Sequence, residues 1–226
     1  MGSEMCIRDR ALLKSAQVFD YVNHSENYGI KISKSSVDFD SIISRSRGVA
    51  DGMSKGVNFL MKKNKIDILN GFGKIISKNE VEVTTEENKK EIHKSDNIII
   101  ATGGRSRELP NLKIDNKKVI EYRKAMTLEK QPKKMVVVGS GAIGSEFAYF
   151  YNSIGTEVIL VEYLPNILPL EDIDVSKQLE KSFKKAGVNI MTNTEVLSVD
   201  TKGKGCKVIY KSGDKEEIIE CDIVLS

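Results

Sequence analysis

The spacing of apolar residues predicts two long helices in the first part of the chain. Apolar side chains recur at three- and four-residue steps from Ala11 to about Val22, which is typical of a helix with one buried face. The same period predicts a second helix between Asp38 and about Asn64. Apolar and polar residues then alternate, which predicts short strands. We expect these strands at residues 66–70, 74–76 and 81–85.

Two later apolar runs are continuous rather than alternating. Ile98–Ala101 and Met135–Val138 contain no polar residue, as expected for strands that are buried on both faces of a parallel sheet. Residues 105–132 lie between them and are polar and irregular, so they predict a connection between domains.

Strands and helices alternate from Met135 onward. The expected elements are a strand at Met135–Val138, a helix at Ala142–Ile154, a strand at Glu157–Val161, a helix at Val175–Ala186, a strand at Val188–Met191 and three alternating strands near Glu195–Asp200, Cys206–Tyr210 and Glu217–Val224. This order predicts a three-layer α/β fold of the Rossmann type with a small antiparallel meander.

Composition excludes several classes of function. The chain has 226 residues, 40% of them hydrophobic and 30% charged, which favours one or two folded domains over disorder. Its net charge of +3 gives no reason to expect nucleic acid as a partner. No apolar run approaches the roughly 18 residues of a membrane span, and no signal-peptide core is present, so we expect no membrane and a cytoplasmic location. The three cysteines and two histidines form no metal-type cluster, so no metal site is expected.

The strongest motif is the sequence GSGAIG between a predicted buried strand and a predicted helix. A GxGxxG loop in this context binds the pyrophosphate of a dinucleotide. Gly139 permits a tight turn, Gly141 lets the pyrophosphate approach the backbone, and Gly144 lets the helix lie close to the strand. The positive end of the helix favours the phosphates. The expected binding residues are Gly139, Ser140, Gly141, Ala142, Ile143 and Gly144.

An acidic residue ends the second predicted strand of this unit. Glu162 follows Gly139 by about 20 residues, the distance at which a carboxylate accepts hydrogen bonds from the adenosine ribose. It would repel a 2′-phosphate, and no Arg or Lys lies between Tyr163 and Glu171 to bind one. The pattern therefore favours NAD over NADP. Glu146, in the first turn of the helix, is explained equally well by the helix dipole and by a functional role.

Several segments resemble the flavin-dependent pyridine nucleotide-disulfide oxidoreductases, and within them the dihydrolipoamide dehydrogenases. The segments are ALLKSAQVFDYVNH, IIIATGG, SRELPNL, PKKMVVVGSGAIGSEFAYFYNSIGTEVILVEYLPNILP and TNTEV. The resemblance covers about residues 11–226. It implies an oxidoreductase that oxidises protein-bound dihydrolipoamide through a redox dithiol and FAD and reduces NAD+ to NADH.

The resemblance also implies roles for single residues. The residues implied to contact FAD are Thr102, Gly103 and Gly104, which match a turn near the flavin, and Gly73, which matches a glycine beside the adenine. Glu162 matches the ribose carboxylate, and Val196 matches a backbone contact to the NAD adenine. Glu146 matches a carboxylate close to nicotinamide and flavin.

The chain departs from the family pattern at both ends. It has no amino-terminal GxGxxG and no Cys-x4-Cys redox pair, and neither His24 nor His93 matches the catalytic His–Glu base. No catalytic residue is therefore expected, and the chain is expected to be an inactive fragment that binds only NAD(H). The expected organisation is a non-native leader at 1–10, a partial FAD-binding domain and linker at 11–132 and an NAD-binding domain at 133–226, without the carboxy-terminal dimerisation domain.

For the whole enzyme, the resemblance implies FAD as a second cofactor, a homodimer, and the lipoyl domain of a 2-oxo acid dehydrogenase complex as partner.

Two alternative functions remain open. One is another FAD-dependent disulfide reductase, similar to glutathione or mercuric reductase. The other is a non-catalytic NAD(H)-binding module.

Overall fold

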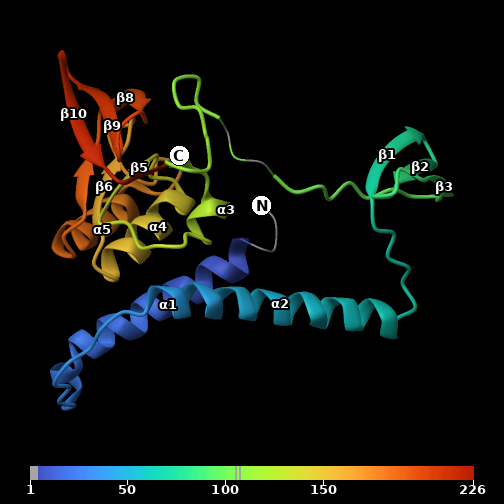
Figure 1. Ribbon diagram of the computed structural model, residues 1–226, viewed down its shortest axis with the longest axis horizontal. Coiled ribbons are helices and arrows are strands. Elements are labelled where there is room, and N and C mark those ends of the chain that lie inside the picture. The colour runs from blue at the N-terminus through green and yellow to red at the C-terminus, as the bar shows by residue number, and fades with distance from the viewer. Residues whose placement is uncertain (1–4, 105, 107) are drawn as a thin grey trace. The chain divides into compact units, whose positions relative to one another are not determined.

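The computed structural model of the chain describes residues 5–104, 106 and 108–226 and contains two compact units (Figure 1). One contains residues 51–104, and the other contains the described residues of 2–50 and 105–226. The helices are α1 (Met5–Asn23), the 3-10 turn η1 (Ser25–Tyr28), α2 (Phe39–Lys63), α3 (Tyr122–Ala125), α4 (Ala142–Ser153) and α5 (Ile173–Lys185). The strands are β1 (Phe72–Ser77), β2 (Glu80–Thr84), β3 (Lys90–Lys94), β4 (Val119–Ile120), β5 (Lys134–Val138), β6 (Glu157–Val161), β7 (Asn189–Met191), β8 (Thr194–Asp200), β9 (Cys206–Ser212), β10 (Lys215–Cys221) and β11 (Ile223–Leu225).

A parallel sheet forms the centre of the larger unit, with the strand order β4-β11-β5-β6-β7. Strands β5 and β6 pair in register from Lys134 opposite Glu157 to Val138 opposite Val161. Their apolar side chains are buried, which explains why the sequence of each strand is a continuous apolar run. An antiparallel sheet, β10-β9-β8, adjoins the parallel one. The prediction of a Rossmann-like α/β fold with an antiparallel meander is confirmed.

Helices α1, α2 and α4 contribute to one hydrophobic core in this unit. Leu12 of α1 and Phe39 of α2 are buried in it together with Phe147 and Tyr151 of α4. Tyr151 is fully buried, and its hydroxyl donates a hydrogen bond of 2.6 Å to the carbonyl of Ala125. Burial raises the pKa of Tyr151 far above its usual range. This hydroxyl therefore stays protonated and fixes α3 against α4.

Tyr151→Phe is expected to lower the free energy of unfolding by about 1 kcal/mol, because a buried carbonyl loses its donor while the ring remains packed. Urea denaturation of the larger unit would measure the change. Tyr28→Phe is a suitable control, because this side chain is exposed and its substitution should change the unfolding free energy by less than about 0.5 kcal/mol. Equal effects of the two substitutions would contradict the role assigned to the Tyr151 hydroxyl.

The smaller unit contains the antiparallel sheet β1-β2-β3. The predicted strand at Ile98–Ala101 does not form: the segment is irregular, and the side chains of Ile99 and Ile100 are 90% and 70% exposed. A buried parallel strand needs paired neighbours and covering helices. Among the described residues, no strand pairs with this segment, so its apolar composition alone does not produce a strand.

Two further elements differ from the sequence-based expectation. Helix α1 begins at Met5, inside the stretch 1–10 that was expected to be a separate leader, and residues 1–4 lie outside the described part. No Gly or Pro lies between Met5 and Ala11, and an existing helix extends readily through such a sequence. The predicted connection 105–132 also contains regular structure, because β4 pairs with β11 at the edge of the parallel sheet.

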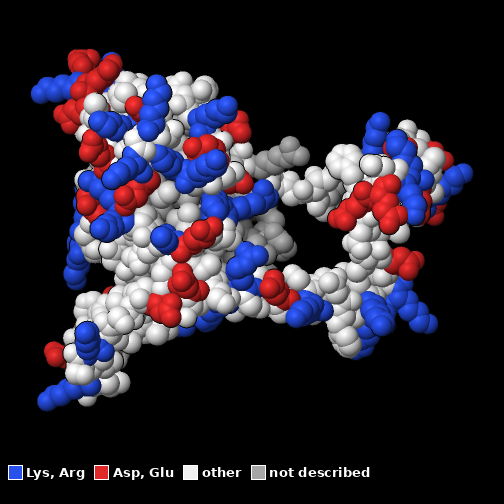
Figure 2. All heavy atoms as spheres, viewed as in Figure 1, with Lys and Arg blue, Asp and Glu red and all other residues white. Residues whose placement is uncertain are grey.

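No helix in the described ranges is long and apolar enough to cross a membrane. On the face shown in Figure 2, the side chains of Lys and Arg are interspersed with those of Asp and Glu. The mixture of charges on this face agrees with the nearly balanced composition.

Candidate functional site

The glycine loop connects the end of β5 to the start of α4. Gly139 has φ +93°, a conformation that side chains other than glycine rarely adopt, and its N–H donates to the carbonyl of Val161 at 2.8 Å. Gly141 then caps α4. At Gly144 an added Cβ would lie 2.0 Å from the carbonyl oxygen of Gly139. The first turn of α4 therefore rests directly on the loop, which only glycine at position 144 allows.

Glu162 is held inside this loop by hydrogen bonds from the backbone and from Ser140. Its Oε2 accepts from Ser140 N at 2.8 Å and from Ser140 Oγ at 2.6 Å, and its Oε1 accepts from Leu164 N at 2.9 Å. Both Glu162 and Ser140 are buried. A carboxylate can accept about four hydrogen bonds, so Glu162 has one lone-pair position left for a ligand hydroxyl.

A cavity of about 400 Å³ opens beside Glu162 at the carboxyl ends of β5 and β6. The residues that line it are Leu109, Pro110, Asn111, Val138, Gly139, Val161, Glu162, Tyr163, Thr194, Glu195 and Val196. Ligands of open α/β sheets bind outside the carboxyl ends of the strands. The cavity thus combines the glycine turn, a buried carboxylate and apolar walls in the place where an adenosine would fit.

Glu146 lies one turn into α4, on the side of a second cavity of about 420 Å³ that Ala142, Leu13 and Phe183 also line. Burial raises the pKa of Glu146, and the charge of Asp9 and a hydrogen bond with Asp9 raise it further. Burial likewise raises the pKa of Asp9. The position of Glu146 is thus explained in this chain by a contact with α1.

The structure brings together the predicted residues of the larger unit. The loop residues Gly139, Ser140, Gly141, Ala142, Ile143 and Gly144 join β5 to α4, and Glu146, Glu162 and Val196 line the two cavities that adjoin this loop. Among the described residues, no group of His, Cys, Asp and Glu is arranged to hold a metal ion.

The residues implied to contact FAD do not form a comparable site. Gly73 in β1 and the segment Thr102–Gly104 are exposed and belong to the unit of residues 51–104. An added Cβ at Gly73 would meet only Val81 Cγ1, at an ordinary 3.7 Å, and one at Gly103 or Gly104 would meet nothing within 4 Å. The described residues of this unit therefore provide no cradle that fits FAD.

The sequence did not identify several residues that line the cavity beside Glu162. Asn111 lies in the connection that was expected to be irregular, and Glu195 is the second residue of β8, the strand that also carries Val196. Both lie in segments that carry the family resemblance, SRELPNL and TNTEV, but no residue type or spacing there points to a ligand contact. Ser140 was predicted as a loop residue, but its two hydrogen bonds to Glu162 join positions that are distant in sequence and could not be foreseen.

Comparisons with known proteins identify relatives of the chain. The sequence model of the pyridine nucleotide-disulphide oxidoreductases matches residues 4–226. The dihydrolipoyl dehydrogenase of Zymomonas mobilis is 42% identical over 92% of this chain and 45% of its own length. The mitochondrial dihydrolipoyl dehydrogenase of Pisum sativum is 36% identical over 97% of this chain and 44% of its own length.

A solved structure shares the fold. LpdA from Mycobacterium tuberculosis matches with a TM-score of 0.87 at 24% identity, over 97% of this chain and 48% of the other. The chain thus spans about half the length of the relatives it matches. The glycine loop, its carboxylate and a family match that covers nearly every residue together lead to one conclusion: the chain belongs to the pyridine nucleotide-disulphide oxidoreductase family, whose cofactors are FAD and NAD.

Proposed function

We propose that residues 133–226 bind NAD(H), with the pyrophosphate at the start of α4 and the adenosine in the cavity beside Glu162. The observation that carries this proposal is the 2.0 Å approach of a Gly144 Cβ to the Gly139 carbonyl. Such packing places the first-turn amides of α4, which have no helical acceptor, at the end of β5. These amides and the positive helix end are suited to a pyrophosphate.

Glu162 is the group that would select NAD over NADP. Its remaining lone-pair position can accept a ribose hydroxyl, whereas a 2′-phosphate would place negative charge against a buried carboxylate. The bound cofactor would supply hydride transfer. The chain's own contribution is to bind and orient it.

Glu162→Ala is expected to weaken NADH binding about 10- to 100-fold, since a hydrogen bond to a charged group contributes roughly 1.5–3 kcal/mol. NADPH binding should change far less. Calorimetric titration of both dinucleotides would measure the two dissociation constants.

Glu157→Gln is the matched control. Glu157 begins the same strand, is exposed and pairs with Lys134 at 2.9 Å, so its loss should leave both dissociation constants within about twofold of the parent values. Equal losses of NADH and NADPH binding in Glu162→Ala would contradict the ribose assignment.

For the whole protein, the proposal is a dihydrolipoyl dehydrogenase that oxidises protein-bound dihydrolipoamide and reduces NAD+. The names of the Zymomonas mobilis and Pisum sativum relatives support it. FAD, a second subunit and the lipoyl domain of a 2-oxo acid dehydrogenase complex would be its further partners. Residues 11–132 would belong to the FAD-binding domain and linker. We propose a cytoplasmic location on the basis of the bacterial relative. The plant relative is named as a mitochondrial protein.

The 226-residue chain by itself is expected to form no NADH from NAD+ and dihydrolipoamide, because its sequence contains no Cys-x4-Cys redox pair. Absorbance at the NADH band measures this directly. A yellow preparation with dihydrolipoamide-dependent NADH formation would contradict it. Activity with glutathione disulfide or a mercuric salt in the parent enzyme would instead favour the other disulfide reductases.

A non-catalytic NAD(H)-binding module is the second candidate. Its support is that the glycine loop and Glu162 can bind a dinucleotide by themselves. The sequence of the gene upstream of Met1 distinguishes the two functions. A continuous reading frame with GxGxxG and Cys-x4-Cys motifs would support the enzyme, and a genuine start codon at Met1 would support the module.

A further inference from the structure

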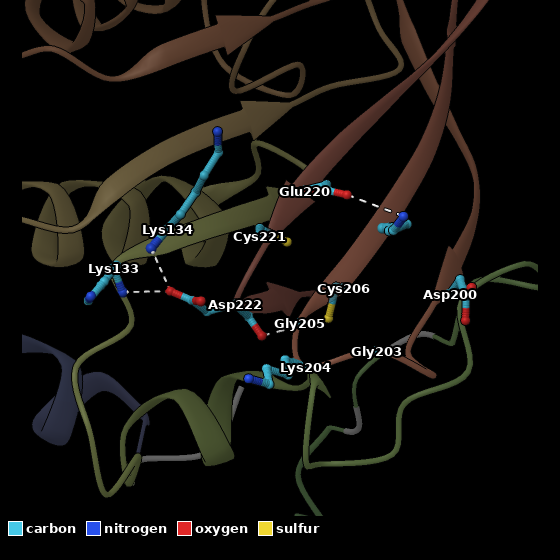
Figure 3. A pocket seen from close by; sticks show the side chains of 11 residues that line it. Lys133, Lys134, Asp200, Gly203, Lys204, Gly205, Cys206, Glu220, Cys221 and Asp222 are labelled. Carbon is cyan, nitrogen blue, oxygen red and sulfur yellow. Dashed lines mark hydrogen bonds and ion pairs between the residues drawn. The ribbon is translucent and has the colours of Figure 1, made fainter.

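A third cavity, of about 430 Å³, lies where the antiparallel sheet meets the parallel sheet of the larger unit (Figure 3). Two free cysteines line it: Cys206 begins β9 and Cys221 ends β10. It shares no lining residue with the cavity beside Glu162. The proposed function assigns no role to this pair.

Cys206 and Cys221 lie directly opposite each other in the register of β9 and β10. Opposed residues of antiparallel strands have Cα atoms about 4.5 or 5.5 Å apart. Both distances lie within the range of about 4.4–6.8 Å that a disulfide spans. The Cys206 thiol donates weak hydrogen bonds to the carbonyls of Lys118 and Asp222, at 3.8 and 3.7 Å. The backbone spacing of the pair therefore allows a disulfide without rearrangement of the strands.

The surroundings distinguish the two thiols. The neighbouring Cys221 thiol lowers the pKa of Cys206 against the opposing effect of burial, and the charge of Lys118 lowers it further, while Asp115 and Asp222 act in the opposite direction. The neighbouring Cys206, together with burial, raises the pKa of Cys221. Cys206 is thus the thiol that ionises first, and Cys221 keeps its proton.

The cavity gives a small oxidant access to sulfurs that are otherwise covered. Cys206 is 1% exposed and Cys221 is 7% exposed, so a reagent must enter through the cavity. Its walls carry four lysines and three carboxylates. They are Lys133, Lys134, Lys204, Lys207, Asp200, Glu220 and Asp222. An uncharged peroxide can pass such a mixed wall without an electrostatic penalty.

We propose that Cys206 and Cys221 are a redox-modification site that closes to a cross-strand disulfide when the chain meets a peroxide. The Cys206 thiolate attacks the peroxide oxygen, which gives a sulfenic acid and releases one water after protonation. The Cys221 thiol then attacks this sulfur, its proton leaves with the hydroxyl as a second water, and the S–S bond forms. Two thiols lose two electrons and two protons, and hydrogen peroxide becomes two waters.

The disulfide would lie within the antiparallel sheet, beside the point where this sheet is hydrogen-bonded to the start of the parallel one. Asp222 follows Cys221, and its Oδ2 accepts hydrogen bonds from the N–H groups of Lys133 and Lys134, at 2.8 and 3.0 Å (Figure 3). These residues lead into β5, the strand that ends at the glycine loop. Oxidation would thus join the start of β9 to the end of β10, and Asp222 connects that end to the segment that enters β5.

Peptide mapping of the peroxide-treated folded chain tests the proposal without any substitution. After denaturation and alkylation, mass spectrometry should find the peptides of Cys206 and Cys221 linked, with the mass lowered by two hydrogens (about 2 Da). Reduction with dithiothreitol should break this link, so that both cysteines can be alkylated again. If both cysteines remain alkylatable under peroxide, become separately over-oxidised, or pair with Cys6 instead, the proposal is wrong.

Two serine variants test the assigned order of attack. In Cys221→Ser the charge of Lys118 still acts on Cys206, so Cys206 should be oxidised to its sulfenic or sulfinic acid at a rate near that of the parent. In Cys206→Ser the remaining Cys221 should be oxidised at least about tenfold more slowly, because its pKa is raised. Equal rates in the two variants would contradict Cys206 as the attacking thiol.

Discussion

Gly144→Ala is expected to weaken NADH binding by at least about 100-fold, the effect of displacing binding groups by about an ångström. The alanine Cβ would lie 2.0 Å from the carbonyl oxygen of Gly139 and 3.3 Å from Val137 Cγ1. The first contact is with backbone, which cannot rotate away as a side chain can. Helix α4 must therefore move off β5, and the amides proposed to hold the pyrophosphate move with it. Calorimetric titration of the variant with NADH would measure the change in the dissociation constant.

Gly141→Ala separates this steric effect from a general sensitivity of the loop. Gly141 has φ −62°, and an added Cβ there meets nothing within 4 Å. The fold should therefore tolerate this alanine, with a change in unfolding free energy below about 1 kcal/mol, even if the methyl group hinders the pyrophosphate. Gly144→Ala with parental NADH affinity would show that the close approach of α4 to the loop is not required.

Leu160→Ala is expected to lower the free energy of unfolding of the larger unit by about 2–5 kcal/mol. Leu160 lies in β6, has no exposed surface and packs in the same core as Phe147 and Tyr151. Truncation to alanine leaves a cavity between the parallel sheet and α4 that the closely packed neighbours cannot fill. Urea denaturation with a probe in the larger unit would measure the change.

Leu170→Ala is the matched control, because the same chemical change is made at a side chain that is 97% exposed. It should alter the unfolding free energy by less than about 0.5 kcal/mol. Similar losses for the two leucines would mean that the core assigned to α4 and the parallel sheet is wrong.

The sequence predicted the centre of the larger unit well because the signals there are local. The apolar run of β6 has the predicted bounds, Glu157–Val161, and α4 begins at the predicted Ala142. The glycine spacing fixes where β5 ends and α4 starts, and the buried sheet makes the apolar runs continuous. The loop and Glu162 were expected to act together, and the structure places them in hydrogen-bonding contact through Ser140.

The remaining features depend on partners distant in sequence. Ile98–Ala101 has the composition of a buried strand, yet no described strand pairs with it and it stays exposed. Strand β4 has only two residues and exists because β11, which follows it by more than a hundred positions, lies beside it. Asn111 likewise lines the cavity only because the connection 105–132 folds beside the carboxyl ends of the strands. Such long-range pairings leave no periodic signal in the sequence.

The most direct test of the account is calorimetric titration of the unmodified chain with NADH and, separately, with NADPH. The account predicts saturable binding of one NADH per chain and at least about tenfold weaker binding of NADPH, because the 2′-phosphate would meet the carboxylate of Glu162. Absence of saturable NADH binding by the folded chain, or equal affinity for the two dinucleotides, would contradict it.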